Sequence, residues 1–229
     1  MSSEVHAVSR WRLAAFIAGL LSLWAAVGSP LASMDHHLLT AHMAQHLLLM
    51  TVAAPLILLG VPTISLWPGF KRVRAFGSIV THPVFCWLAG TAVVIGWHVP
   101  VLFELGMRSA LWHEIEHASF FAAGLLFWWP VIRPLSSLAT SPRWYVPLYL
   151  FVATLPCDAL SAFLTFCGRV IYPQYLSSHR LFDISPLGDQ ECAGALMWVW
   201  VTFVYLAPAA AITIQMLSPQ RPALNAEVV

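Results

Sequence analysis

The chain has 229 residues, and its 11 Lys and Arg plus 10 Asp and Glu make only 9% of it charged, against roughly 25% in an ordinary soluble domain. A soluble globule of this size needs more charge to cover its surface, so the 59% apolar content and the mean hydropathy of +0.77 exclude that class. The 13% of aromatic residues excludes a disordered chain, and the net charge of +1 excludes the basic surface of a nucleic-acid-binding domain. A polytopic membrane protein remains.

Six apolar stretches are each long enough to cross a bilayer, which takes about 20 helical residues. We predict helices, because lipid-exposed backbone must satisfy its own hydrogen bonds and none of the stretches alternates between polar and apolar residues as a barrel strand does. The expected fold is therefore an all-α, polytopic membrane helical bundle of six transmembrane helices, a single transmembrane domain over residues 1–229. The predicted spans are Trp11–Gly28, His37–Gly60, Ile79–His98, Leu111–Ile132, Trp144–Gly168 and Asp189–Leu217.

The Lys and Arg residues indicate the orientation, because short cytoplasmic loops are enriched in cations. With a cytoplasmic N-terminus, eight of the 11 cations fall in cytoplasmic segments and three in outer loops, so we expect both termini in the cytoplasm. The inner cations are Arg10, Arg12, Lys71, Arg72, Arg74, Arg133, Arg143 and Arg221, and the outer ones are Arg108, Arg169 and Arg180.

On this topology most of the ten histidines gather on the outer side of the membrane. Four of them form two pairs inside spans, His42 with His46 and His113 with His117. A spacing of four places both imidazoles of a pair on one helix face, one turn apart. A single interfacial histidine is well tolerated, but two intramembrane pairs indicate a function, since ionisable groups inside a span are costly. The outer-side histidines are His36, His37, His42, His46, His98, His113, His117 and His179.

The first pair belongs to a stripe of histidine and methionine on the second span. At 100° per residue, Met43 and Met50 fall on the same sector as His42 and His46, although methionines alone are more often core fillers. His46 lies nine residues from the start of its span, or about 14 Å along the helix, too deep for easy contact with bulk water. The stripe is therefore a candidate for metal binding.

The second pair is part of the sequence His113-Glu114-Ile115-Glu116-His117. These five residues match H-E-x-x-H, the pattern in which two histidines bind zinc and the glutamate acts as general base of a metalloprotease. An intramembrane zinc protease that uses His113, Glu114 and His117 is therefore an alternative, with Asp158 or Asp189 as the third ligand.

Two carboxylates and His98 add to the outer-side polar groups. Asp158 lies near the middle of the fifth span, where an isolated carboxylate is expensive and should be protonated, paired or bound to a cation. Asp189 opens the last span and has an alternative role as a helix cap. Imidazole and thioether together suit copper, and zinc is also compatible with imidazole and carboxylate. The predicted metal ligands and supporting residues are His42, His46, His113, His117, His98, Met43, Asp158 and Asp189.

The four cysteines form no C-x-x-C pair. Cys86 and Cys157 are expected to be small buried hydrophobes, with Cys157 also a possible soft ligand beside Asp158. Cys167 and Cys192 fall at the outer ends of the last two spans, where an oxidising compartment would allow them to form a disulfide.

Several short motifs follow one another in order along nearly the whole chain, and together they are specific. At these residues the sequence resembles the multi-span CtaG family of cytochrome c oxidase assembly factors, as distinct from the single-span copper chaperone of the same name. The matching stretches are His42-Met43-Ala44-Gln45-His46-Leu47-Leu48-Leu49-Met50, Ala54-Pro55-Leu56, Leu59-Gly60-Val61-Pro62, Trp97-His98-Val99-Pro100, Glu116-His117, Phe127-Trp128-Trp129-Pro130-Val131, Tyr172-Pro173-Gln174-Tyr175, Asp189-Gln190, Ala193-Gly194 and Met197-Trp198.

The resemblance implies a non-enzymatic assembly factor in the bacterial cytoplasmic membrane, with copper supplied on the periplasmic side. Its partners would be subunits of the oxidase, a copper ion or copper chaperone, and the lipid bilayer, with no nucleic acid. The functional residues would be His42, His46, His98 and His117, with Asp189 beside them. In this family pattern Glu116 recurs and Glu114 does not, so the protease-like match is interpreted as accidental.

A third interpretation is a membrane haem protein with one axial histidine from the second span and one from the fourth. Because the histidines cluster on one side, at most one haem fits. A copper site between these spans, exchangeable enough to release its ion, remains the leading prediction.

Overall fold

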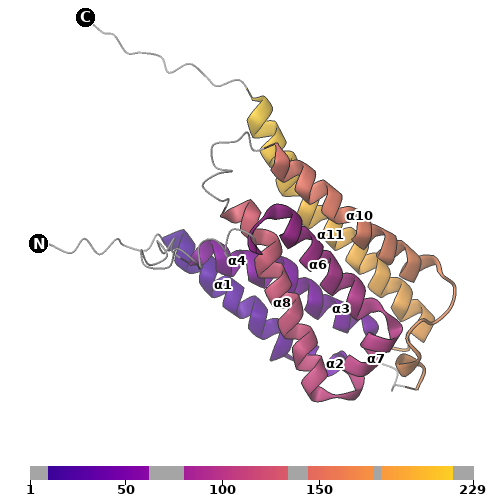
Figure 1. Cartoon of the computed structure of the whole chain (residues 1–229). Helices are drawn as coiled ribbons and strands as arrows, with labels where there is room; N and C mark the ends of the chain where they lie inside the picture. Colours follow the sequence, from indigo (N-terminus) through magenta and orange to yellow (C-terminus); the bar gives the residue numbers. More distant parts are fainter. Residues whose placement is uncertain (1–9, 62–79, 134–143, 178–181, 219–229) are drawn as a thin grey trace, which may run out of the picture.

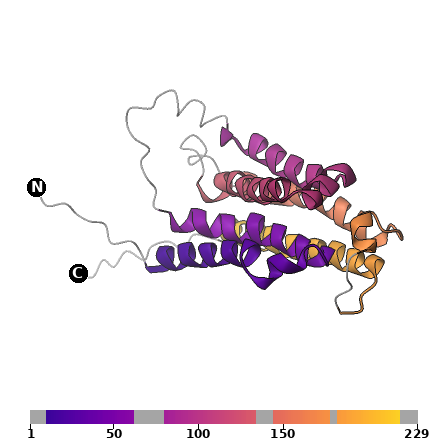
Figure 2. The ribbon, with the colours of Figure 1, turned by 90° about the horizontal axis from the view of Figure 1, so that it is seen from below.

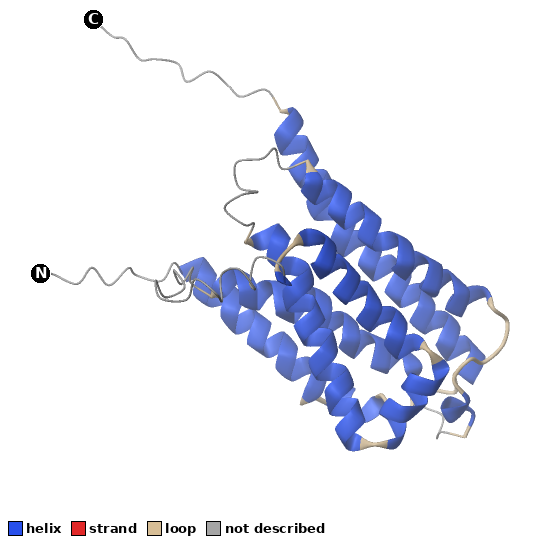
Figure 3. Cartoon of the chain, in the orientation of Figure 1, coloured by secondary structure: helices blue, strands red, loops and turns tan. Residues whose placement is uncertain are grey.

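The computed structural model describes residues 10–61, 80–133, 144–177 and 182–218, and within these ranges all regular secondary structure is helical (Figures 1 and 3). The predicted all-α membrane bundle is confirmed. The elements are α1 (Arg10–Val27), α2 (Pro30–Met34), α3 (Leu39–Leu47), the π-helix η1 (Leu48–Ala53), α4 (Ala54–Gly60), α6 (Pro83–His98), α7 (Pro100–Arg108), α8 (Ala110–Ile132), α10 (Tyr145–Phe166), the 3₁₀-helix η2 (Pro173–Leu176) and α11 (Pro186–Leu217).

Five segments of the described chain are long and apolar enough to cross a membrane as they stand, and a bent pair makes a sixth. The pair is α6 and α7, which meet at an angle of 75°. The bend falls at Val99, whose ψ of 125° is extended, because the following Pro100 disfavours a helical conformation in the residue before it. The predicted third span therefore continues into a helix that turns across one end of the bundle.

The outward faces of the helices are apolar, as a lipid environment requires. On α1, large side chains such as Trp11, Leu21 and Trp24 are more than half exposed, and α11 exposes Phe203 in the same way. A soluble protein would not present such faces over most of its surface. The helix α1 begins and α11 ends at the same end of the bundle, opposite α2 and α7 (Figures 1 and 2).

The second span is not a continuous α-helix, because the π-helix η1 separates α3 from α4. Pro55 has no N–H, so the carbonyl of Thr51, four residues earlier, cannot receive the usual helical hydrogen bond. The chain widens instead, and the N–H of Ala54 donates to the carbonyl of Leu49, five residues back. Two tryptophans hold this segment in place: Trp200 donates to the Thr51 hydroxyl (2.8 Å), and Trp128 donates to the Met50 carbonyl (3.1 Å). Such π segments are frequent near functional sites.

The core lies where α3 and η1 pack against α8 and α11. Helix α1 packs on η1 and α4, α6 packs on α8, and α10 lies along α11. Seen from below, α1 and α6 lie on opposite faces of the bundle (Figure 2). The second span is the most deeply buried of the five that cross as they stand, so it is the central helix and carries its histidine stripe into the interior.

Candidate metal centre

The two histidine pairs meet at the end of the bundle where α3 and α8 begin and α6 ends. The rings of His42 and His113 are stacked with centroids 5.6 Å apart, and the rings of His46 and His117 are 5.8 Å apart. All four come from the faces predicted by the spacing of four. The structure therefore brings together the four histidines of the predicted site.

Glu116 is the carboxylate at the centre of this cluster. Its Oε1 atom lies 3.3 Å from Nε2 of His42 and 3.4 Å from Nε2 of His46, and all three side chains are at most 5% exposed. One ligand atom from each of the three falls within 4.8 Å of the others, a spacing that one metal ion can bridge. Two imidazoles and a carboxylate suit copper or zinc.

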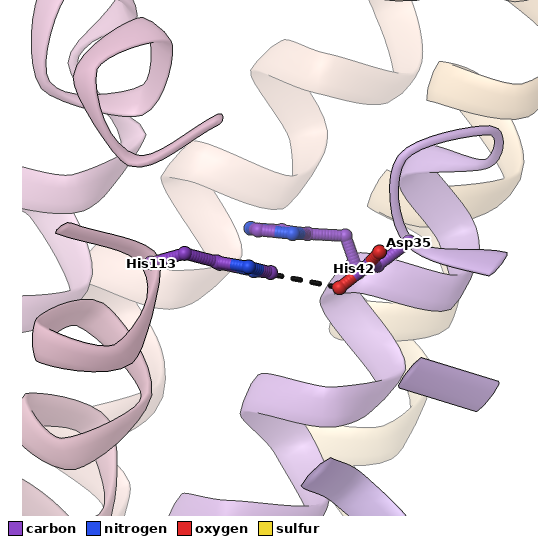
Figure 4. Close-up of side chains that lie close together, drawn as sticks. All are labelled: Asp35, His42 and His113. Carbon is purple, nitrogen blue, oxygen red and sulfur yellow. Dashed lines mark ion pairs between the residues drawn. The ribbon is translucent and has the colours of Figure 1, made fainter. Parts of the chain in front are cut away.

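A second carboxylate, Asp35, faces His42 and His113 from the turn between α2 and α3 (Figure 4). Its Oδ2 atom lies 3.4 Å from Nε2 of His113, and its side chain is 2% exposed. Asp35, His42 and His113 again offer ligand atoms within 4.8 Å of one another. His42 is shared by both triads, so the site is a continuous strip of donor atoms from Asp35 inward to His46.

Several of the nitrogen and oxygen atoms of this strip that could bind a metal are buried. They have no hydrogen-bond partner in the part of the chain that the structure describes. They include Nδ1 of His42, Nε2 of His117 and Oε2 of Glu116. Leaving a buried polar atom unsatisfied costs about 1–3 kcal/mol, and such atoms in a native fold call for an explanation such as an ion. A bound cation would satisfy these atoms together.

Helix α7 and the 3₁₀-helix η2 cover the cluster. The Phe103 ring packs 5.0 Å from His42 and 4.0 Å from Tyr172. The backbone of α7 approaches the cluster at Gly106, where a Cβ atom would lie only 2.6 Å from Oε2 of Glu116. The absence of a side chain at this position allows the cover to close over the carboxylate.

Two tyrosines of the Tyr172-Pro173-Gln174-Tyr175 motif attach the cover to the helices beneath. The hydroxyl of Tyr172 donates to the carbonyl of His98 (3.0 Å), and that of Tyr175 donates to the carbonyl of Asp35 (2.8 Å). Burial raises the pKa of both phenols above the usual value, so they remain protonated donors. These bonds hold η2 and the residue before it over the site.

His98 and Met43 form a pair slightly deeper in the bundle. Nε2 of His98 lies 3.3 Å from the sulfur of Met43, and Nδ1 of His98 lies 2.7 Å from the carbonyl of Val94. Because that carbonyl can only accept, Nδ1 carries the hydrogen and the lone pair on Nε2 points toward the sulfur. This is the tautomer that a metal-binding imidazole needs at Nε2.

The side chain of Asp189 makes its hydrogen bonds with the start of α3 rather than with the histidine cluster. Its carboxylate accepts from the backbone N–H groups of Leu39 (2.6 Å) and Thr40 (3.0 Å) and from the Thr40 hydroxyl (2.7 Å). It therefore caps α3, a helix 150 residues away in the sequence, rather than facing a ligand position. Its role here is to place the start of the helix that carries His42.

We expect Asp189→Ala to lower the stability of the protein by about 1–2 kcal/mol, because two N–H groups at the start of α3, one of them buried, lose their acceptor. The measurement is the thermal unfolding midpoint of the purified protein in detergent. Glu191→Ala is the matched control, because Glu191 lies on the exposed face of the same helical turn. An equal shift in the two variants would contradict this role for Asp189.

Asp158 is half-buried on α10, outside both triads. Its Oδ1 atom is buried, and it has no hydrogen-bond partner among the described residues. Asp158 therefore lies apart from the histidine cluster, although it was a predicted ligand. The carboxylates that the structure brings to the cluster belong to Glu116 and Asp35.

Glu114 lies on the exposed face of α8, whereas Glu116 is 1% exposed. Glu116 was noted in the sequence only through the family pattern and was left out of the predicted ligand set. Helical spacing contains a signal for it, since Glu116 falls three residues after His113 on the same face. Asp35 was missed, and its only sequence signal is its position directly before His36 and His37.

The disulfide that the sequence leaves open between Cys167 and Cys192 is not formed in the structure, where both are free thiols. The amide of Gln190 donates to the sulfur of Cys167 (3.2 Å) and to the carbonyls of Leu164 and Arg169. Cys192, two residues later on α11, is exposed on another face. The Gln190 amide, rather than a covalent bond, joins the ends of α10 and α11.

The close packing of the histidine rings argues against the haem alternative. His42 and His46 have centroids 4.3 Å apart, and Phe120 stacks on His46 at 3.8 Å. Together with the close ring contacts between α3 and α8, this means that a porphyrin would require the two helices to separate. A single ion requires no such movement.

The fold and the site define a polytopic helical membrane protein with a buried cluster of histidines and carboxylates near one end. Comparison with family models matches residues 2–218 to the cytochrome c oxidase caa3 assembly factor family, Caa3_CtaG. The chain belongs to this family, which confirms the resemblance drawn from the motifs. No curated protein and no solved structure was found to match the chain.

Proposed function

We propose that this assembly factor binds copper at the histidine and carboxylate cluster and delivers it to cytochrome c oxidase. The observation that carries the proposal is Glu116, a buried carboxylate within 3.4 Å of two buried imidazoles from another helix. A protein that needed these polar groups only for packing would satisfy them with hydrogen bonds. Here several of the nitrogen and oxygen atoms that could bind a metal have no hydrogen-bond partner among the described residues.

The choice of copper over zinc rests on the neighbouring sulfur. Imidazole and carboxylate accept either metal, but a thioether such as Met43, in contact with His98, favours copper. Zinc remains the alternative metal for the Glu116 triad itself. Glu114 has no catalytic role in this proposal, because its side chain lies on the exposed face of α8, away from the Glu116 triad.

We further propose that the cluster faces the periplasmic side of the bacterial cytoplasmic membrane. Of the five Lys and Arg residues in the described ranges, three lie at the opposite end of the bundle, where α1 begins and α8 ends: Arg10, Arg12 and Arg133. The other two, Arg108 at the end of α7 and Arg169 just after α10, lie at the end that holds the cluster. Since cytoplasmic loops are enriched in cations, the end opposite the cluster is assigned to the cytoplasm, which leaves both termini cytoplasmic. The partners would then be oxidase subunits and a periplasmic copper ion or copper chaperone, with no nucleic acid.

The proposal predicts that a variant with His42, His46 and His117 replaced by Ala retains no Cu(II) after loading with that ion and washing. The wild-type protein should retain at least one ion per chain, measured by elemental analysis of the purified protein. His82→Ala is the matched control, because His82 lies at the other end of the bundle, at the start of α6. Copper retention by the triple variant at the wild-type level would exclude the site.

The cellular role is tested separately by the metal content of the oxidase. A strain that lacks this chain should assemble oxidase with less copper, and the wild-type gene should restore it while the triple histidine variant should not. Full copper content in the deletion strain would contradict delivery, whatever the purified protein binds.

A further inference from the structure

A cavity of about 50 Å³ lies directly inward of the histidine cluster, in the middle of the bundle. Three methionines and one cysteine are among the residues that line it. We call this cavity the thioether chamber and define it by six of its lining residues: Met43, Met50, Met197, Cys157, His46 and His98.

These side chains come from four different spans. Met43 and Met50 belong to the second span, His98 to α6, Cys157 to α10 and Met197 to α11. The three methionines are 1–5% exposed and Cys157 is 9% exposed. Soft donor atoms from helices far apart in the sequence therefore converge on one buried space.

We propose that the thioether chamber is a second metal site that binds monovalent copper. Thioether and thiol sulfur with imidazole is the donor set that selects Cu(I), whereas zinc gains little from a thioether. The methionines bind in their uncharged form, so an ion can enter without first displacing protons from them. This proposal rests on the proposed copper function.

Charge favours a monovalent ion at this depth. The idealised Born cost of moving an ion out of water scales with the square of its charge, so a divalent ion pays about four times the cost of a monovalent one. The chamber walls are mostly apolar, with aromatic rings from Phe120, Phe127 and Tyr205. Neither Glu116 nor Asp35 lines the chamber, so no carboxylate there would offset a second charge.

The chamber is continuous with the outer cluster through His46. The Nε2 atom of His46 lies 3.4 Å from Glu116, and the same imidazole lines the chamber. His98 also borders the chamber, and its Nε2 atom already lies 3.3 Å from the Met43 sulfur. An ion leaving the histidine and carboxylate triad inward would therefore meet imidazole and thioether next.

The test uses Ag(I), a redox-inert stand-in for Cu(I), and Zn(II) as separate probes of the full-length protein in detergent. A variant with Met43, Met50 and Met197 replaced by Leu should bind Ag(I) about 10–100-fold more weakly while its Zn(II) binding is unchanged. Leucine keeps the volume of methionine, so the fold should tolerate the change. Met216→Leu, on the exposed end of α11, is the matched control and should bind both ions like the wild type.

The two proposals fail in different ways. Unchanged Ag(I) affinity in the triple methionine variant would overturn the chamber. Unchanged Zn(II) and Cu(II) affinity in a variant with His42→Ala and Glu116→Gln would overturn the outer site and leave the chamber standing. X-ray absorption of the wild-type protein loaded with Cu(I) needs no variant, and we expect sulfur neighbours around the metal. A shell of nitrogen and oxygen alone would also overturn the chamber.

Discussion

Replacing Glu116 with glutamine should weaken metal binding by about 100-fold, the upper end of what the loss of a group supporting a metal site costs. Among the described residues, Glu116 is the acidic side chain with an oxygen within 3.4 Å of both His42 and His46. A glutamine keeps the size of the side chain, but its neutral amide is a poor ligand and places an NH₂ group against one of the imidazoles. The measurement is copper and zinc affinity of the purified variant, together with its ability to support oxidase assembly in a deletion strain.

Glu114→Gln is the control for this prediction, since Glu114 lies two residues away on the exposed face of the same helix. We expect wild-type affinity and full oxidase assembly from it. The same pair of variants separates an assembly factor from a zinc protease, because a protease of the H-E-x-x-H type requires Glu114 as its base. Loss of function in Glu114→Gln with Glu116→Gln unaffected would reverse the assignment.

Replacing Gly124 with alanine should destabilise the protein by about 3 kcal/mol, the upper end for overpacking of a buried interface. A Cβ atom at this position would lie 2.7 Å from the carbonyl oxygen and 2.8 Å from the Cα of Met50. Both obstructing atoms belong to the backbone of η1, which is held by the Trp128 indole, so no side chain can rotate away. Helix α8 would have to move off the second span.

The same movement separates His42 and His46 from Glu116 and His117, so Gly124→Ala should also weaken metal binding. Gly96→Ala is the control, because a Cβ there meets no atom within 4 Å. In a helix, alanine is favoured over glycine by about 0.5–1 kcal/mol, so this variant should be neutral or slightly more stable. Thermal unfolding in detergent and metal titration measure both effects. Equal unfolding midpoints in the two variants would show that the close packing at Gly124 is not required.

Much of the site could be predicted because it depends on helical spacing. The four-residue separation within each histidine pair fixed which faces carry the imidazoles, and the same spacing places Glu116 beside His113. The H-E-x-x-H pattern instead points to Glu114, which is 100° away from His113 around the helix, whereas Glu116 is only about 60° away. The bend at Val99 was also present in the sequence as an X-Pro pair, but its 75° angle depends on how α7 packs over the cluster.

Contacts between distant parts of the chain could not be predicted in this way. Asp189 caps a helix that starts 150 residues earlier, and Asp35 reaches His113 from a turn on the other side of the cluster. In the sequence alone, Asp189 is compatible with either a metal ligand or a helix cap, and Asp35 was not among the predicted ligands. Whether such a carboxylate caps a helix, forms an ion pair or is available to bind a metal depends on which segments pack against it.

By itself the sequence determined the class of the protein, its helical spans and the faces that carry histidine, because composition and a period of 3.6 residues act within single segments. It also determined the family, through short motifs spread over nearly the whole chain. Tertiary structure alone decided which carboxylates join the histidines and that three methionines from two spans line one cavity. The reason is physical: burial and donor geometry at a metal site are properties of the space between helices, and that space exists only after they pack.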